Sequence, residues 1–343
     1  MTIVRKNTLI IKMLITAAIV SSWGKGAAEE LVKDQEAINP VPQINDQLVS
    51  EQEIDNKALS NNELLQQLQS QSDDVRQRAQ QQLARTGEES IIPQVAELLR
   101  HDEGTVRAAA EWVLGKLKAT SVADDIAELL NDPVRSVRYQ AINALAEMNQ
   151  QSYAELIVPF LDDSDSSMRG VACRALGLLQ YKPAAQKITT LLEDEDKDVR
   201  YGAAIFLGML APFDSSIIES ILKLLEHTNF DIQKNVIIAL GRIGESSVAP
   251  YVAGKLTSSN QEIRMTAVSE LGRIKDKTFA ADIANFLDDP DDLMQLAAAE
   301  GLEYLSGEDW DKPTFCLTGA IAPYVEKARS WWNAHKDRPE FQK

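Results

Sequence analysis

Three aspartates at alternate positions are the clearest chemical signal in the chain. Asp194, Asp196 and Asp198 stand in the run EDEDKD, and carboxylates at this spacing are typical of calcium loops. An EF-hand would need glycine at the sixth position and glutamate at the twelfth, where this chain has Val199 and Ile205. Aspartates also cap helix N-termini, so we expect a structural role for them and predict no metal site.

Arginines recur at a regular interval and could form a ladder of anion-binding side chains. Each follows an apolar residue directly, and the set is Arg76, Arg107, Arg138, Arg169, Arg200 and Arg264. A fixed place in most repeats fits ion pairing with loop carboxylates better than ligand binding. We therefore expect the partners to be loop acids such as Asp132, Asp163, Asp194 and Asp289.

Histidine and cysteine give no pattern that predicts catalysis. His101, His227 and His335 lie in different repeats, and no phosphate-binding loop, nucleophile elbow or zinc-protease motif is present. Cys173 occupies a core position, and Cys316 lies in a terminal loop. Packed helices about 8–10 Å apart would separate the two thiols far beyond disulfide reach. We predict no cofactor, no catalytic residue and no enzymatic activity.

These residues sit within a repeat of 31 residues that begins at Asn61. The first residue of the pattern, here called the anchor, is one of Val75, Val106, Val137, Met168, Val199, Ile232, Ile263 and Met294. Eight residues after every anchor stands a leucine, and seven residues before every anchor stands another. The fourth residue after the anchor is alanine in all units except one, which has Val236. A period of this length predicts a stack of similar structural units.

The spacing within each unit predicts two helices joined by a short loop. The anchor and the positions four, eight and eleven residues later form one apolar stripe, as in Val137, Ala141, Leu145 and Met148. A second stripe follows the loop and ends at the leucine before the next anchor. One unit cannot bury both stripes alone, so the sequence predicts an all-α stack of about eight two-helix units over residues 61–305.

Two of the units, DPVRSVRYQAINALAEM and DEDKDVRYGAAIFLGML, resemble HEAT repeats of the short type found in phycobilin lyases. The resemblance covers residues 61–332 and implies an α-α superhelix, or α-solenoid, in which the second helix of each unit lines the concave side. Some related repeat proteins bind two irons through paired His-Glu dipeptides, and this sequence contains no such dipeptide. The resemblance therefore supports the fold and leaves the function open.

The two ends differ from the repeats. Residues 1–28 combine a basic start with a short apolar stretch and small residues before Glu29, which is typical of a cleaved signal peptide; an uncleaved anchor is the alternative. We expect an exported protein, periplasmic or extracellular, with no stable membrane span after cleavage. Residues 29–60 read as a flexible acidic spacer. Residues 306–343 read as a long loop and a C-terminal capping helix, with aromatic residues that cover the open end of the stack.

Net charge limits the class of partner. The chain carries 52 acidic and 35 basic residues, a net charge of -17, which argues against nucleic acid. The outward positions of the second helices give the predicted partner-binding residues, which are Glu97, Asp124, Asp125, Glu128, Glu155, Tyr251 and Tyr324. We expect a protein with a basic patch to dock on the acidic residues, with the tyrosines as apolar anchors; a merely solvated helix face is the alternative.

The sequence thus predicts a non-catalytic protein-binding scaffold of the cell envelope. Two other functions remain open, a chaperone-like subunit of a bilin lyase and a regulatory subunit of an envelope enzyme. The signal segment argues against the lyase, since those proteins are expected inside the cell.

Overall fold

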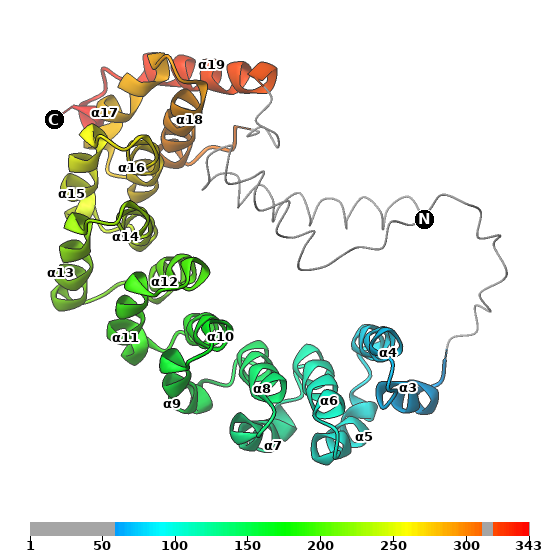
Figure 1. Cartoon of the computed structure of the whole chain (residues 1–343). Coiled ribbons are helices and arrows are strands. Elements are labelled where there is room, and N and C mark those ends of the chain that lie inside the picture. The colour runs from blue at the N-terminus through cyan, green and yellow to red at the C-terminus, as the bar shows by residue number, and fades with distance from the viewer. Residues whose placement is uncertain (1–58, 311–317, 343) are drawn as a thin grey trace. The chain divides into compact units, whose positions relative to one another are not determined.

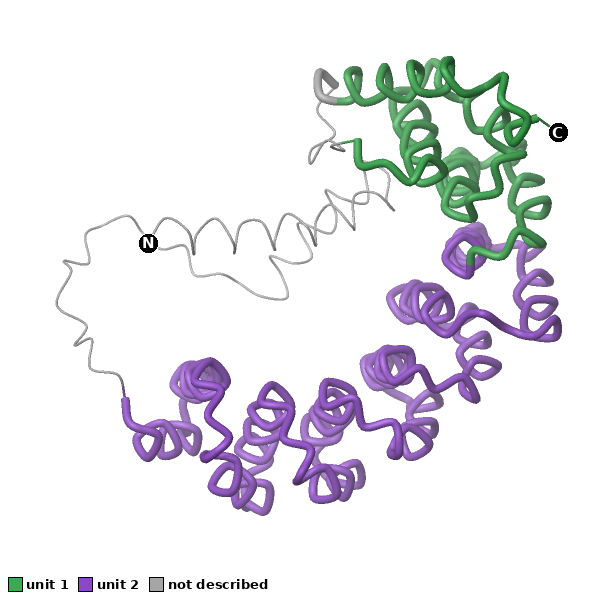
Figure 2. Tube along the Cα trace, turned by 180° about the vertical axis from the view of Figure 1, so that it is seen from behind, with its two compact units in different colours: residues 1–54, 244–343 green, residues 55–243 purple. Residues whose placement is uncertain are grey.

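The computed structural model describes residues 59–310 and 318–342, and every regular element within these ranges is a helix. The predicted signal segment 1–28 and residues 29–58 of the predicted spacer lie outside them. The chain divides into two compact units (Figure 2). Among the described residues, unit 2 covers 59–243, and unit 1 covers 244–310 and 318–342.

Unit 2 alternates long and short helices. The long helices are α4 (Asp73–Thr86), α6 (Gly104–Lys116), α8 (Arg135–Glu147), α10 (Ser166–Leu178), α12 (Lys197–Leu210) and α14 (Phe230–Ile243). The short helices are α3 (Asn61–Leu68), α5 (Ile92–Glu97), α7 (Ala123–Glu128), α9 (Ala154–Ile157), α11 (Ala185–Thr190) and α13 (Ser215–Lys223). After α3, each short helix continues into a 3₁₀ turn that ends just before the next loop.

The predicted apolar stripes form the core. The leucines eight residues after the anchors are all buried, and so are the alanines four residues after the anchors. Side-chain caps begin several long helices as expected; the carboxylate of Asp196, for example, accepts hydrogen bonds from the amides of Asp198 and Val199. Ser60 and Glu63 form the predicted capping box at the start of α3. The all-α fold built from HEAT-like repeats is therefore confirmed.

The two layers of unit 2 have different places on its curve. The long helices α6, α8, α10 and α12 lie on the inner side, and the short helices α7, α9 and α11 lie on the outer side (Figure 1). The expectation that the second helix of each pair lines the concave side is wrong here.

Glycines explain the direction of this curvature. A Cβ atom added to Gly115 of α6 would lie 3.0 Å from Ala144 Cα of α8, and one added to Gly177 of α10 would meet Phe206 of α12. Small residues thus let successive long helices approach closely. Closer spacing makes the layer of long helices shorter along the curve than the layer of short helices. The long helices must therefore lie on the inside of the curve.

Unit 1 continues the repeat and ends with a longer helix. Its helices are α15 (Ala249–Ala253), α16 (Gln261–Ile274), α17 (Ala280–Ala284), α18 (Asp292–Ser306) and α19 (Thr318–His335). Gly272 of α16 lies directly against the backbone of Gly301 in α18. Helix α19, in the segment where the sequence predicts a capping helix, packs on α18, while Cys316 lies outside the described residues.

Aromatic side chains gather around the C-terminal helix. Trp310 and Trp331 have ring centroids 5.7 Å apart, and Trp331 and Phe341 have centroids 5.6 Å apart. These contacts fit the predicted capping role of the terminal aromatics. Within residues 59–310 and 318–342, no helix combines the length and the hydropathy needed to cross a membrane.

Candidate functional site

Acidic side chains gather on the outer layer of unit 2. The exposed face of α5, α7 and α9 carries five carboxylates, which we call the acidic outer surface; they are Glu97, Asp124, Asp125, Glu128 and Glu155. The opposite face of these helices is fully buried at Val95, Ile126 and Ile157. Because the apolar side of each short helix is buried, the acidic residues on its other side must face solvent.

Polar contacts connect neighbouring short helices across this surface. Arg100 follows α5, and its Nη2 lies 2.8 Å from Asp125 Oδ1 of α7. The Tyr153 hydroxyl, which precedes α9, donates a hydrogen bond to Asp124, and this bond raises the pKa of the tyrosine. The contacts hold two of the five carboxylates, whereas Glu97, Glu128 and Glu155 are exposed. The structure thus places Asp124 and Asp125 against the neighbouring short-helix segments, and all five predicted acidic residues lie on α5, α7 and α9.

One apolar residue on this surface was missed by the sequence analysis. Leu156 is 52% exposed and follows Glu155 directly on α9. A leucine on the polar face of a short amphipathic helix was the available signal, because its neighbour Ile157 occupies the buried stripe. An exposed leucine among carboxylates gives the surface an apolar contact point.

The two predicted tyrosine anchors have different environments. Tyr251 of α15 is 54% exposed, as predicted, but it belongs to unit 1. Tyr324 of α19 is only 3% exposed, and its hydroxyl donates a 2.5 Å hydrogen bond to Glu303 Oε2. Burial and this hydrogen bond raise the pKa of Tyr324. The prediction of Tyr324 as an exposed anchor is wrong, because α19 packs on α18 and turns this side chain onto that helix.

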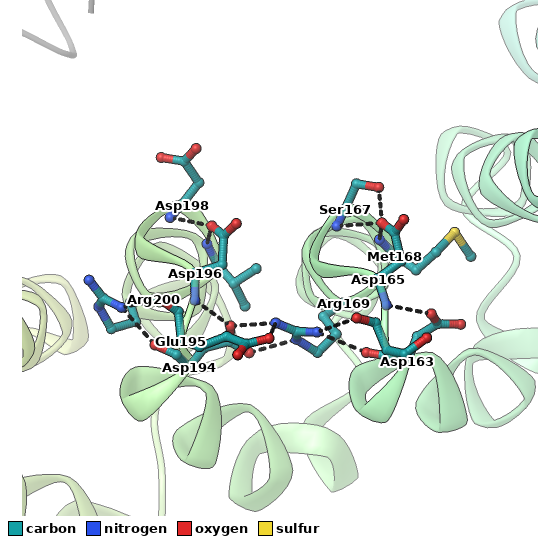
Figure 3. Close-up of polar contacts among 12 residues, drawn as sticks. Asp163, Asp165, Ser167, Met168, Arg169, Asp194, Glu195, Asp196, Asp198 and Arg200 are labelled. Atoms are coloured by element: carbon teal, nitrogen blue, oxygen red, sulfur yellow. Dashed lines mark hydrogen bonds and ion pairs between the residues drawn. The ribbon is translucent and has the colours of Figure 1, made fainter. Parts of the chain in front are cut away.

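The arginine ladder is structural, as predicted (Figure 3). Arg169 Nη1 donates to the backbone oxygens of Asp163 and Ser164, at 2.9 and 3.3 Å. Its Nε and Nη2 donate to the two carboxylate oxygens of Asp194 in the next repeat, both at 2.7 Å. Arg107 repeats this arrangement with Asp132 at 2.8 and 2.9 Å. Each such arginine joins the loop before its own helix to the loop of the next repeat.

Two of the predicted carboxylate partners have other roles. Asp163 accepts the backbone amide of Asp165 at 2.9 Å, and Asp289 accepts the amide of Asp291 at the same distance. Arg200 pairs instead with Asp231, the second residue of α14. Asp163 and Asp289 thus shape the turns that precede α10 and α18.

The D-x-D-x-D segment is used in the same way. Asp194 pairs with Arg169 and accepts the amide of Asp196, while Asp196 caps α12 (Figure 3). Both carboxylate oxygens of Asp194 and Oδ1 of Asp196 therefore accept hydrogen bonds from within the protein. Within the described part of the chain, no group of three His, Cys, Asp or Glu side chains is arranged to hold a metal ion.

Two buried groups have strongly shifted acidities. Cys173 is a core thiol, as expected, and its burial raises its pKa. Glu111 of α6 is fully buried, and neither of its carboxylate oxygens has a hydrogen-bond partner within the described structure. Burial, with a smaller contribution from Asp132 and in opposition to Arg107, raises the pKa of Glu111 to about 10. The side chain is therefore protonated at neutral pH.

Comparisons with solved structures agree with this architecture. The Escherichia coli protein YibA has a TM-score of 0.54 at 20% identity, with 73% of this chain and 93% of that chain covered. Kap95p, solved with RanGDP, has a TM-score of 0.53 at 12% identity, with 80% and 42% covered. The CpcE–CpcF complex of phycocyanin lyase from Nostoc sp. PCC7120 has a TM-score of 0.42 at 18% identity, with 76% and 99% covered.

Sequence comparisons identify the family. A search of curated proteins gives no match. The HEAT-repeat family profile matches this chain three times, at residues 61–146, 123–208 and 218–303. Because these matches span well over half of the sequence and coincide with the observed helix pairs, the chain belongs to the HEAT-repeat family.

Proposed function

We propose that this chain is a non-catalytic scaffold that binds a partner protein carrying a basic patch. The observation that carries the proposal is the acidic outer surface, where three successive short helices, α5, α7 and α9, carry five carboxylates. Three of them, Glu97, Glu128 and Glu155, are exposed and available to cations on a partner. Complementary charge of this kind steers association and selects the partner.

Leu156 supplies what a purely charged face lacks. Protein interfaces combine a polar rim with apolar contacts that exclude water. With Leu156 exposed beside Glu155, the outer surface offers both. We therefore propose Leu156 in place of Tyr324 as an apolar anchor of this interface.

We further propose that the protein acts in the cell envelope after export. The support is the sequence of residues 1–28, with a basic start, an apolar stretch and small residues before Glu29.

A related fold in Kap95p is found with a bound protein, RanGDP, which is in keeping with a binding role for such repeats.

The proposal is tested with the full chain and a triple charge reversal, Glu97→Lys, Glu128→Lys and Glu155→Lys. Affinity capture from envelope extract identifies proteins that bind the wild type, and the affinity of each purified partner is then measured by calorimetry. We expect the reversal to weaken the partner's affinity at least about tenfold, because like charges then face each other across the interface.

A matched control separates the surface from net charge. The substitutions Asp74→Lys, Asp102→Lys and Asp198→Lys change the charge equally, at exposed positions near the starts of the long helices. They should leave the affinity within about twofold. The proposed interface would be refuted if the two triple variants lost partner affinity equally, or if the charge reversal on the outer surface caused no loss of affinity.

A further inference from the structure

The inner side of unit 2 carries a second surface whose chemistry is opposite to that of the outer side. The anchor stripe of each long helix packs against the short helices. Residues two, six and ten positions after the anchor lie on the opposite side of the helix, away from the short helices. We call the part of this face formed by α6, α8 and α10 the inner surface; its main residues are Trp112, Lys116, Tyr139, Arg174 and Leu178.

Aromatic and aliphatic groups are accessible on the inner surface. Tyr139 is 36% exposed and Leu178 is 37% exposed, and both come from the middle or end of a long helix rather than from a loop. Trp112 is half-buried, and Lys116 Nζ lies 5.6 Å from the centre of its ring. Exposed apolar side chains on consecutive helices mark a binding surface when they lie together.

Positive charge accompanies these apolar groups. At the second, sixth and tenth positions after the anchors of α6, α8 and α10, the cations are Lys116 and Arg174, and both are exposed. At these positions in the described helices, the carboxylate is Glu147, which lies 2.7 Å from Lys116 Nζ. The chain as a whole has a net charge of -17, so this excess of cations is a local feature.

The two cations of the inner surface differ in their partners: Lys116 forms an ion pair with Glu147, whereas Arg174 has a neutral partner. Arg174 Nη1 donates a 2.7 Å hydrogen bond to the side-chain oxygen of Asn143, a neutral partner. Arg174 remains exposed and retains guanidinium donors that can bind a carboxylate in bidentate fashion. Arginine beside tyrosine and tryptophan is the composition most enriched at the energetic centres of protein interfaces.

We infer that the inner surface of unit 2 binds an acidic polypeptide segment that carries aromatic or aliphatic side chains. Lys116 and Arg174 bind carboxylates of the segment, while Trp112, Tyr139 and Leu178 contact its apolar side chains. Charge complementarity favours this occupant over a basic peptide. A nucleic acid is disfavoured because its long polyanion would meet the negative charge of the rest of the chain. This site is separate from the acidic outer surface, and its ligand has the opposite charge.

A peptide-binding assay with the full chain tests the inference. The probe is a fluorescein-labelled twelve-residue peptide in which Asp and Glu alternate with Phe and Leu, and binding is followed by fluorescence anisotropy. The double substitution Lys116→Glu and Arg174→Glu should weaken binding at least about tenfold. The substitution Tyr139→Ser, which removes apolar contact without changing charge, should weaken it a few-fold. The substitution Lys223→Glu, at an exposed position of the short helix α13, changes charge in the same direction as control and should bind as the wild type does.

Control probes distinguish the other possible occupants. A peptide with Lys in place of every acid, a peptide with Ser in place of every apolar residue, and oligodeoxythymidine should all bind at least about tenfold more weakly. Equal binding of any of these, or no binding of the acidic apolar probe, would overturn the inference. Tighter binding by a synthetic peptide of residues 29–58 would assign the surface to the chain's own segment. If the double substitution Lys116→Glu and Arg174→Glu changed the sedimenting mass but left the probe affinity unchanged, the inner surface would be assigned to a second copy of the chain. Either of these two results overturns the proposed partner.

Discussion

The buried carboxyl of Glu111 makes a quantitative prediction about pH and stability. In the folded protein its pKa is about 10, whereas the ordinary value is 4.5. Between these two values the folded state keeps the proton and the unfolded state releases it. The unfolded state therefore binds fewer protons, and the free energy of unfolding falls by about 1.4 kcal/mol for each unit of rising pH. From pH 5.5 to 8.0 the loss attributable to Glu111 amounts to about 3 kcal/mol.

The substitution Glu111→Gln removes this titration while it preserves the shape of the side chain. Urea unfolding of the wild type and the variant, followed by circular dichroism at pH 5.5 and pH 8.0, gives the two free energies of unfolding. We expect the variant to gain stability relative to the wild type by about 3 kcal/mol between the two pH values. Asp132, the nearest carboxylate, does not contribute in this window, because Arg107 and the Val134 amide outweigh its burial and lower its pKa.

A control on the protein surface makes the test specific. Glu128→Gln alters an exposed carboxylate of α7 and should leave the pH dependence of the wild type unchanged. A difference between wild type and Glu111→Gln that stays constant from pH 5.5 to 8.0 would refute the reasoning. The reasoning would also be refuted if the pH dependence of Glu128→Gln matched that of Glu111→Gln instead of that of the wild type.

Three further predictions concern stability. Arg169→Met should lower the free energy of unfolding by about 3–5 kcal/mol, because it leaves a buried carboxylate unpaired, whereas Arg135→Met in an exposed pair should cost under about 1 kcal/mol; urea denaturation distinguishes them. Gly272→Ala should lower the melting temperature because a Cβ would collide with the next helix, while Gly254→Ala, with no atom within 4 Å, should leave it unchanged or raise it. Tyr324→Phe should cost about 1–2 kcal/mol through the lost hydrogen bond to a carboxylate and increase hydrogen exchange in α19; unchanged exchange would contradict the role of this bond.

The core and the ladder could be predicted because they depend on one repeat and its neighbour. The positions of Ala141 and Leu145 on one helical stripe follow from the period of an α-helix, and the structure buries both completely. The pairing of Arg169 with Asp194 likewise depends on a spacing that recurs along the chain. Interactions of this kind are encoded within about 31 residues, so the sequence pattern exposes them.

The features that escaped prediction depend on wider packing. Which layer lies inside the curve of unit 2 is decided by how closely Gly115 and Gly177 let successive helices approach. Tyr324 is buried because α19 packs on α18 and its hydroxyl reaches Glu303, so its environment differs from that of Tyr251 at the same place in its unit. The division after Ile243 is not visible in the periodicity, which continues across it without a change of residue types.

The arginine ladder also determines how local opening can spread along unit 2. Its ion pairs connect α6 to the loop before α8, α10 to the loop before α12, and α12 to α14. Within the described residues, no ion pair joins Arg138 of α8 to Asp163, and Arg138 bonds two backbone oxygens of its own loop. In a one-dimensional array, the coupling between neighbours sets the size of the segment that opens together. Between α8 and α10 an exposed pair, Arg135 with Asp165, stands where the other steps have a more buried one. Unit 2 is thus a chain of unequal couplings, in which fraying from one end has a natural place to stop.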